Sequence, residues 1–217
     1  MTIAHKIADR LLEIQAVKLN PGQAFIWASG LRSPIYCDNR KILSYPIIRH
    51  ELVDGFVGLS QQFNGYQAIA GVATAGIAWG ALLADKLGLP FCYVRSKPKE
   101  HGLKNLIEGH LEPRSKVLVI EDLISTGGSS IEACEALKAE GHEIEAVLAI
   151  FQYEFQIAQT KFQEKSLKFE SLSQFSTLLE RALLHKLINS NEYENLKGWN
   201  QDPAEWSRQF QLQQASL

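Results

Sequence analysis

Residues 117–130 have the sequence Val-Leu-Val-Ile-Glu-Asp-Leu-Ile-Ser-Thr-Gly-Gly-Ser-Ser. The first four residues form an apolar run that is too short for a helix and suits a buried parallel strand. Glu121 and Asp122 follow, and adjacent carboxylates at the mouth of a buried strand are costly unless they face water, a metal or hydroxyl donors. Residues 125–129 are small, and their amides and hydroxyls can close around an anion at the start of a helix. The stretch therefore predicts a strand, a phosphate-binding loop and a helix.

The common nucleotide-binding motifs do not fit this loop. A Walker loop places Lys after its glycines, where this chain has Ser129, and no Gly-x-Gly-x-x-Gly fingerprint is present. Because the acidic pair would repel a phosphate, the ligand must offer hydroxyls first and a phosphate farther along, as a ribose 5-phosphate does. A plain turn above a Ser-capped helix would explain the glycines but not the two carboxylates.

Short apolar runs alternate with helical patterns on both sides of this stretch. Such alternation favours an α/β fold with a mostly parallel central sheet flanked by helices. Ligands bind beyond the C-terminal ends of the strands in such sheets. The expected strands are Ala68–Gly71, Phe91–Val94, Val117–Ile120 and Ile144–Phe151, with helices over Ile77–Leu87 and Ser130–Glu140.

Composition excludes several functional classes. The 217 residues carry a net charge of -2 with both signs interspersed, which implies neither a nucleic-acid-binding stripe nor a membrane-adhering face. Residues 55–84 lack formal charge, but Gln61, Gln62, Asn64 and several glycines argue against a membrane span. Three separated cysteines without a Cys-x-x-Cys pair predict neither a disulfide frame nor a zinc site, and favour a cytoplasmic location.

The stretch at 117–130 resembles the ribose-phosphate-binding motif of the type I phosphoribosyltransferases. The resemblance implies that 5-phosphoribosyl 1-diphosphate is the donor substrate and Mg²⁺ the cofactor. Glu121 and Asp122 would engage the ribose 2- and 3-hydroxyls, directly or through magnesium and water, with no direct protein ligand to the metal assigned. The remaining implied donor-binding residues of this stretch are Leu123, Ile124, Ser125, Thr126, Gly127, Gly128 and Ser129.

Two further segments narrow the resemblance. Residues 95–102, Arg-Ser-Lys-Pro-Lys-Glu-His-Gly, resemble the mobile catalytic loop of orotate phosphoribosyltransferases, and residues 25–40, FIWASGLRSPIYCDNR, resemble the entrance segment of that family. As a solvated charge cluster the basic run would be unremarkable. After a strand in this fold, its cations suit a diphosphate leaving group. Residues 71–76 resemble the diphosphate-side loop of the family.

The resemblance implies transfer of ribose 5-phosphate to orotate, giving orotidine 5-phosphate and diphosphate in pyrimidine biosynthesis. Lys99 and His101 would be catalytic, stabilising the leaving group and binding the donor, and Arg95 would bind the diphosphate. Ser125 would also touch orotate. In the family the catalytic loop reaches into the partner's site, so a homodimer is implied.

The predicted organisation is a single domain over residues 1–217. It comprises an N-terminal base-binding segment at 1–45, a core with the phosphate loop at 65–155, and a C-terminal addition from about 155 to 217. Helical periodicity over residues 172–187 predicts that this addition is helical. The four tryptophans, Trp27, Trp79, Trp199 and Trp206, are expected to be packing anchors.

Two positions depart from the family pattern. Ser96 stands where some members have a second cation, which leaves the contact of Lys97 open, and Ala28 stands where some members have a Lys. A carboxylate contact expected at position 28 must come from elsewhere, with Arg40 or Lys41 as candidates. The alternatives that the sequence leaves open are a purine-base phosphoribosyltransferase and a non-catalytic regulator on the same fold.

Overall fold

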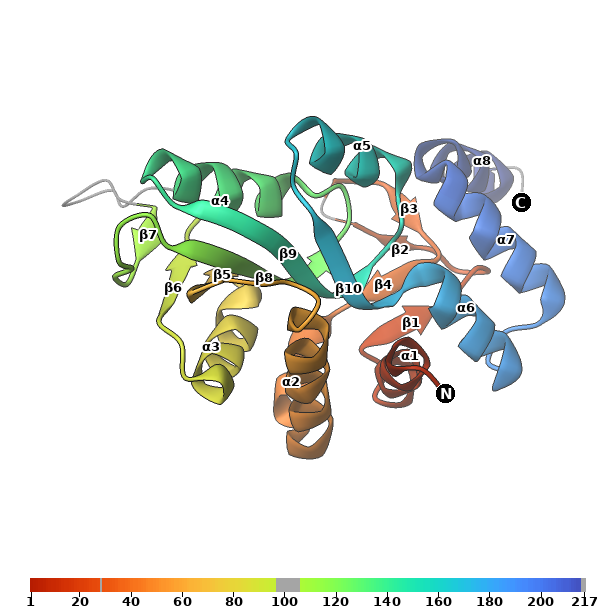
Figure 1. The fold of residues 1–217 in the computed structure, drawn as a ribbon. Helices are drawn as coiled ribbons and strands as arrows, with labels where there is room; N and C mark the ends of the chain where they lie inside the picture. Colours follow the sequence, from red (N-terminus) through yellow and green to blue (C-terminus); the bar gives the residue numbers. More distant parts are fainter. Residues whose placement is uncertain (28, 97–105, 216–217) are drawn as a thin grey trace.

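The protein is built on one six-stranded sheet, seen in a computed structural model that describes residues 1–27, 29–96 and 106–215. The strand order is β10-β9-β8-β5-β6-β7, and only β7 runs antiparallel to its neighbour (Figure 1). This sheet confirms the predicted fold class. The strands are β5 (Ala68–Val72), β6 (Phe91–Val94), β7 (Ile107–Glu108), β8 (Lys116–Ile124), β9 (Glu143–Gln152) and β10 (Phe169–Gln174).

Helices cover both faces of the sheet. The side chains of β8 alternate between two apolar clusters, with Leu118 and Ile120 in one and Val117 and Val119 in the other. Such alternation follows from the two-residue period of a strand. Helices α1 (Ile3–Glu13), α2 (Pro46–Ser60) and α3 (Gly76–Leu87) cover one face, and α4 (Gly128–Ala139) and α5 (Gln156–Glu164) cover the other (Figure 1).

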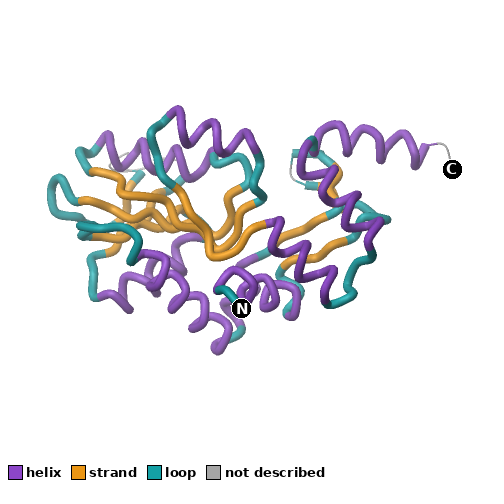
Figure 2. Tube along the Cα trace, turned by 45° about the vertical axis from the view of Figure 1, so that its right-hand side comes forward, coloured by secondary structure: helices purple, strands orange, loops and turns teal. Residues whose placement is uncertain are grey.

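The N-terminal segment and the last helices lie together at one end of the molecule. Strands β1 (Val17–Leu19) and β4 (Ile35–Cys37) form one antiparallel pair, and β2 (Phe25–Ile26) and β3 (Arg32–Ser33) form another. The 3-10 helix η1 (Asn39–Ser44) leads from β4 to α2. Figure 2 shows the C-terminal helices α6 (Phe175–Leu184), α7 (Ser190–Gln201) and α8 (Pro203–Ala215) beside these hairpins.

Two elements differ from the expectation. Strand β8 continues through Ile124, so Glu121 and Asp122 lie within the strand, where Glu121 is opposite Ala149 of β9. Strand β10 includes residues 172–174, which were expected to be helical, and helix α6 begins only at Phe175. Local periodicity missed both because the pairing partner β9 is distant in the sequence.

The uncharged segment 55–84 contains the end of α2, all of β5 and most of α3. Within the described residues, none of the helices has both the length and the apolar character that crossing a membrane requires.

Candidate active site

The loop after β8 turns sharply into α4. Gly127 adopts a left-handed backbone conformation with φ of 76°, and a Cβ at this position would lie 2.6 Å from Cε2 of Phe162. Glycine is therefore required on two grounds, the backbone conformation and the close approach of α5. The loop brings residues 125–127 to the C-terminal edge of the sheet, the edge at which α/β folds bind ligands.

Glu121 fastens the start of α4 to the strand. Its side chain is only 5% exposed, and its carboxylate accepts hydrogen bonds from the Ser129 hydroxyl at 3.0 Å and the Ser130 hydroxyl at 3.2 Å. The other oxygen accepts from the backbone N–H of Asp122 at 3.0 Å. The carboxylate predicted to meet ribose hydroxyls thus accepts its hydrogen bonds from the phosphate loop and its own strand.

Burial raises the pKa of both acidic side chains. Loss of solvent is the main cause of the increase for Glu121, and the negative charge of Asp122 adds to it. Desolvation likewise raises the pKa of the Asp122 carboxyl, although a hydrogen bond with Glu121 opposes the increase. Because both groups are held in a state that disfavours negative charge, a cation or the hydroxyls of a sugar would stabilise their ionised forms.

A cavity of about 350 Å³ lies over the acidic pair. It contains Asp122 together with the loop that precedes α3, so residues from two adjacent strand ends face the same space. Its lining residues are Cys37, Asp38, Arg40, Ala73, Thr74, Ala75, Glu121, Asp122, Leu123 and Ser129.

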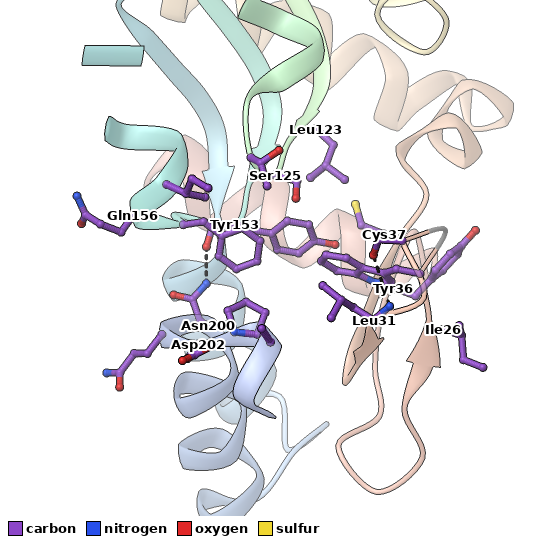
Figure 3. A pocket seen from close by; sticks show the side chains of 18 of the residues that line it. Ile26, Leu31, Tyr36, Cys37, Leu123, Ser125, Tyr153, Gln156, Asn200 and Asp202 are labelled. Atoms are coloured by element: carbon purple, nitrogen blue, oxygen red, sulfur yellow. Dashed lines mark hydrogen bonds between the residues drawn. The ribbon is translucent and has the colours of Figure 1, made fainter. Parts of the chain in front are cut away.

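A larger cavity of about 870 Å³ adjoins the first and shares Cys37, Arg40 and Leu123 with it. Figure 3 shows Leu123 and Ser125 on one side of Tyr153, and Asn200 and Asp202 on the other. The lining comes from four separate parts of the chain: Ile26, Trp27, Ser29, Leu31, Tyr36, Cys37 and Arg40; Leu123, Ser125 and Thr126; Tyr153, Phe155, Gln156 and Ile157; and Asn200, Gln201, Asp202, Pro203 and Ala204.

Aromatic rings form much of the wall of the larger cavity. The rings of Tyr153 and Phe155 are stacked with centroids 5.3 Å apart, and the Trp27 ring lies 5.4 Å from that of Tyr153. These rings pack on one another, with Tyr153 only 2% and Phe155 6% exposed, and give the cavity a largely apolar wall of the kind that binds planar rings. Trp27 therefore lines a cavity instead of serving only as the predicted packing anchor, whereas Trp79 and Trp199 are fully buried.

The base of the predicted catalytic loop lies beside the smaller cavity. Nη1 of Arg95 is 3.4 Å from the Glu108 carboxylate, and Arg95 lines a third cavity of about 450 Å³. This third cavity shares Ala73 and Ser129 with the smaller one. The remaining predicted loop residues, Lys97, Lys99 and His101, and also Ala28, lie outside the described residues.

The structure separates the residues predicted for the phosphate loop. Ser125 and Thr126 line the larger cavity, and Ser129 lines the smaller one. The side chain of Ile124 is buried in the core with 1% exposure, so only its backbone could meet a ligand. Gly127 and Gly128 line none of the three cavities.

Sequence reasoning missed the walls contributed by residues 153–157 and 200–204. Tyr153 and Phe155 follow β9 and could have been found by searching every strand end for ring-binding side chains. Residues 200–204 carry no such signal, since their place depends on how α7 and α8 pack.

The acidic pair fits a magnesium ion that keeps most of its own ligands. Carboxylate oxygens are the hard donors that Mg²⁺ prefers, and Mg²⁺ usually retains several waters in sites that also bind phosphates. Across the part of the chain that the structure describes, no group of three or more His, Cys, Asp or Glu side chains could hold a metal ion. A site made by Asp122, Glu121, water and a phosphorylated ligand would offer hard oxygen donors without a third protein side chain.

Comparison with known proteins shows which family the chain resembles. Residues 49–172 match the family model described as the phosphoribosyl transferase domain. The chain is 48% identical to an orotate phosphoribosyltransferase of Porphyromonas gingivalis, over 94% of this chain and 98% of that protein. A Bacillus pumilus protein of the same name is 50% identical, over 92% of this chain and 94% of that one. The crystal structure of orotate phosphoribosyltransferase from Aeropyrum pernix superimposes with a TM-score of 0.69 at 28% identity, covering 81% and 98% of the two chains.

Proposed function

This chain belongs to the orotate phosphoribosyltransferase family, and we propose that it transfers ribose 5-phosphate from 5-phosphoribosyl 1-diphosphate to orotate. The products are orotidine 5-phosphate and diphosphate, and the reaction is a step of pyrimidine biosynthesis. The purine-base alternative is not favoured, because the curated relatives described above are named for orotate at 48% and 50% identity.

The observation that carries the proposal is the meeting of two unlike cavities at Cys37, Arg40 and Leu123. The smaller cavity has two carboxylates suited to sugar hydroxyls, and the larger one has aromatic walls suited to a planar base. A transfer between a sugar and a base needs the two held next to each other with their reacting atoms aligned.

In the proposed reaction the bond from ribose C1 to the diphosphate oxygen breaks, and its electron pair leaves with diphosphate. Orotate N1 forms the new bond to C1, and its proton passes to water. Positive charge grows on the sugar as the bond breaks, so Asp122 is positioned to stabilise it through the ribose hydroxyls. Lys99 and His101 stabilise the negative leaving group, and either could supply it with a proton.

Magnesium is proposed as the cofactor, held by Asp122 and Glu121 through water and by oxygens of the donor. When bound it neutralises charge on the diphosphate. The support is the buried Glu121 and the half-buried Asp122, which line a cavity together with Ser129 and the 73–75 loop.

Arg40 is the proposed partner of the orotate carboxylate. It is the only Lys or Arg among the described residues that line the larger cavity, and Lys41 lines none of the three. Its Nε donates to Asp38 at 2.6 Å, which leaves the other guanidinium donors for a ligand. This assignment would replace the contact that Ala28 does not supply.

A homodimer that shares its active sites is proposed from the family resemblance of residues 95–102. Mixing Lys99→Ala with Asp122→Asn subunits tests it, because each hybrid dimer would contain one site with neither substitution if the loop acts on the partner. Recovery of activity on mixing is expected. If mixing restores nothing while co-purification of differently tagged subunits shows that hybrid dimers have formed, the sharing of sites is refuted.

The proposed function is tested by the loss of orotate absorbance on incubation with the protein, magnesium and 5-phosphoribosyl 1-diphosphate. Loss is expected only when the donor is present, and adenine and guanine should not be consumed in its place. Absence of orotate loss would overturn the proposal. The three cysteines are unpaired in the structure, which supports a reducing compartment such as the cytoplasm as the site of the reaction.

A further inference from the structure

The corner between α7 and α8, residues 199–204, closes the larger cavity on the side away from the phosphate loop. Five consecutive residues of this corner, 200–204, line the cavity together with Ser125 and Thr126. Figure 3 shows Asn200 and Asp202 across Tyr153 from Ser125. The smaller cavity, over the acidic pair, has no lining residue from this corner. The corner therefore borders the space assigned to the base and not the space assigned to the sugar.

Asn200 connects the corner to the end of strand β8 through a single residue. Its side-chain amide donates a hydrogen bond of 2.5 Å to the carbonyl oxygen of Tyr153. The backbone N–H of Tyr153 donates in turn to the carbonyl oxygen of Ile124 at 3.0 Å, directly before Ser125. The backbone of Tyr153, whose ring lines the larger cavity, is thus held by hydrogen bonds to Asn200 on one side and to Ile124 on the other.

The corner also holds the N-terminal wall of the same cavity. Trp199 is fully buried, and its ring makes edge contacts with Trp27 at 5.8 Å and with Tyr153 at 5.6 Å. On α8, the hydroxyl of the buried Ser207 accepts a hydrogen bond of 3.0 Å from the backbone N–H of Arg32. Hence the C-terminal helices hold in place both aromatic walls that face the base.

We propose that the α7–α8 corner is the distal wall of the orotate site and that Asn200 is its positioning residue, acting on the base through Tyr153. The inference rests on the proposed function and adds the elements that set how the base sits. It predicts an asymmetry between the two substrates. Substitutions in the corner raise the KM for orotate and leave the KM for the sugar donor unchanged, because only the larger cavity has residues from the corner.

The test is a steady-state comparison of KM for each substrate in the full-length chain. Asn200→Ala and Asn200→Asp both remove the amide donor, and each is expected to raise the KM for orotate about fivefold to tenfold, the scale of one lost hydrogen bond. The KM for the donor should stay within about twofold of the unaltered value, because the corner lines only the larger cavity. A general destabilisation of the enzyme would instead affect the KM values of both substrates. Asn200→Gln keeps the amide and should recover part of the loss.

A second variant keeps the test decisive if Asn200→Ala fails to fold. Ala204 is exposed on the cavity wall, so Ala204→Leu adds bulk there without removing a bond. It should raise the KM for orotate alone. Gln211→Leu is the matched control, because it places the same side chain on exposed α8 surface outside the cavity, and it should change neither KM.

The outcomes separate this proposal from the one on which it rests. If the unaltered chain consumes orotate and the Asn200 and Ala204 variants raise both KM values equally, or neither, the distal-wall proposal is overturned and the function stands. If the unaltered chain does not consume orotate, both proposals are overturned.

Discussion

The side-chain amide of Asn39 donates a hydrogen bond of 2.7 Å to the backbone carbonyl oxygen of Asp122, 83 residues farther along the chain. Asn39 is 1% exposed, and its own amide oxygen lies 3.3 Å from the Cys37 thiol. The bond fastens the N-terminal segment to the acidic strand end. It therefore joins the two parts of the chain that meet where the cavities adjoin.

Replacing Asn39 should loosen this junction. We expect Asn39→Ala to lower the free energy of unfolding by about 1–3 kcal/mol, the usual cost of leaving a buried polar group unsatisfied. The KM values for both substrates should rise, since Cys37 lines both cavities. Urea unfolding and steady-state kinetics measure the two effects, and a variant with unaltered stability would show that the bond is dispensable.

Arg40 and Lys41 are neighbours that the structure distinguishes. Arg40→Ala should raise the KM for orotate about tenfold or more, because a hydrogen bond to a charged group contributes about 1.5–3 kcal/mol. Lys41→Ala is the matched control and should leave that KM unchanged, since Lys41 lines none of the three cavities. If Lys41→Ala raises the KM for orotate and Arg40→Ala does not, Lys41 and not Arg40 binds the orotate carboxylate.

The acidic pair should separate into a residue that binds the donor and one that holds the loop. Asp122→Asn is expected to weaken donor binding about tenfold or more by removing charge-assisted hydrogen bonds, measured by calorimetric titration with magnesium present. Glu121→Gln should chiefly reduce stability, because its carboxylate accepts bonds from Ser129, Ser130 and the Asp122 backbone. Donor affinity equal to that of the unaltered protein in Asp122→Asn would mean that Asp122 is structural.

The two glycines of the phosphate loop should differ in their tolerance of a side chain. Gly127→Ala is expected to cost about 1–3 kcal/mol of folding free energy, since the position has a left-handed backbone and Phe162 occupies the space. Gly128→Ala should remain within about 0.5 kcal/mol, because no atom lies within 4 Å of the added Cβ. Chemical denaturation of both variants checks the contrast, which similar losses in the two would disprove.

Stability in acid should depend on Asp9, which joins α1 to α6. Burial tends to raise the pKa of Asp9, but hydrogen bonds from Arg181 and His185 outweigh it and leave that pKa below the usual 3.8. Arg181 binds both carboxylate oxygens at 2.7 Å. Because the pKa of Asp9 is depressed in the folded protein, its carboxylate contributes fully to the free energy of unfolding above the usual pKa. This contribution is lost as the pH falls through the pKa of the folded protein.

Asp9→Asn should therefore lower the free energy of unfolding at pH 7, and its difference from the unaltered protein should shrink below about pH 4. Unfolding curves at pH 7 and pH 3 measure this change. Glu13→Gln removes an exposed carboxylate from the same helix and serves as the control, with a small effect expected at both values. A constant difference for Asp9→Asn at the two pH values would contradict the assignment.

The sequence predicted the strand, glycine turn and helix around residues 117–139 closely and the lining of the larger cavity only in part. Val117 to Gly128 is a continuous segment, so the residue types of its strand, glycine turn and helix start stand next to one another in the sequence. The walls of the larger cavity come from residues 26–40, 123–126, 153–157 and 200–204, which meet only because the sheet order and the packing of α7 place them together. No local pattern marks Asn200 as the neighbour of Tyr153.

By itself, the sequence determined the fold class, the strand–turn–helix around Gly127 and the family resemblance. Each depends on residue types at short and regular spacing, which set strand, turn and helix directly. Only the tertiary structure decided that Glu121 holds the loop while both carboxylates line the smaller cavity with Ser129, and that the C-terminal helices close the larger one. These outcomes depend on burial and on contacts between distant segments, and such contacts exist only once the chain has packed.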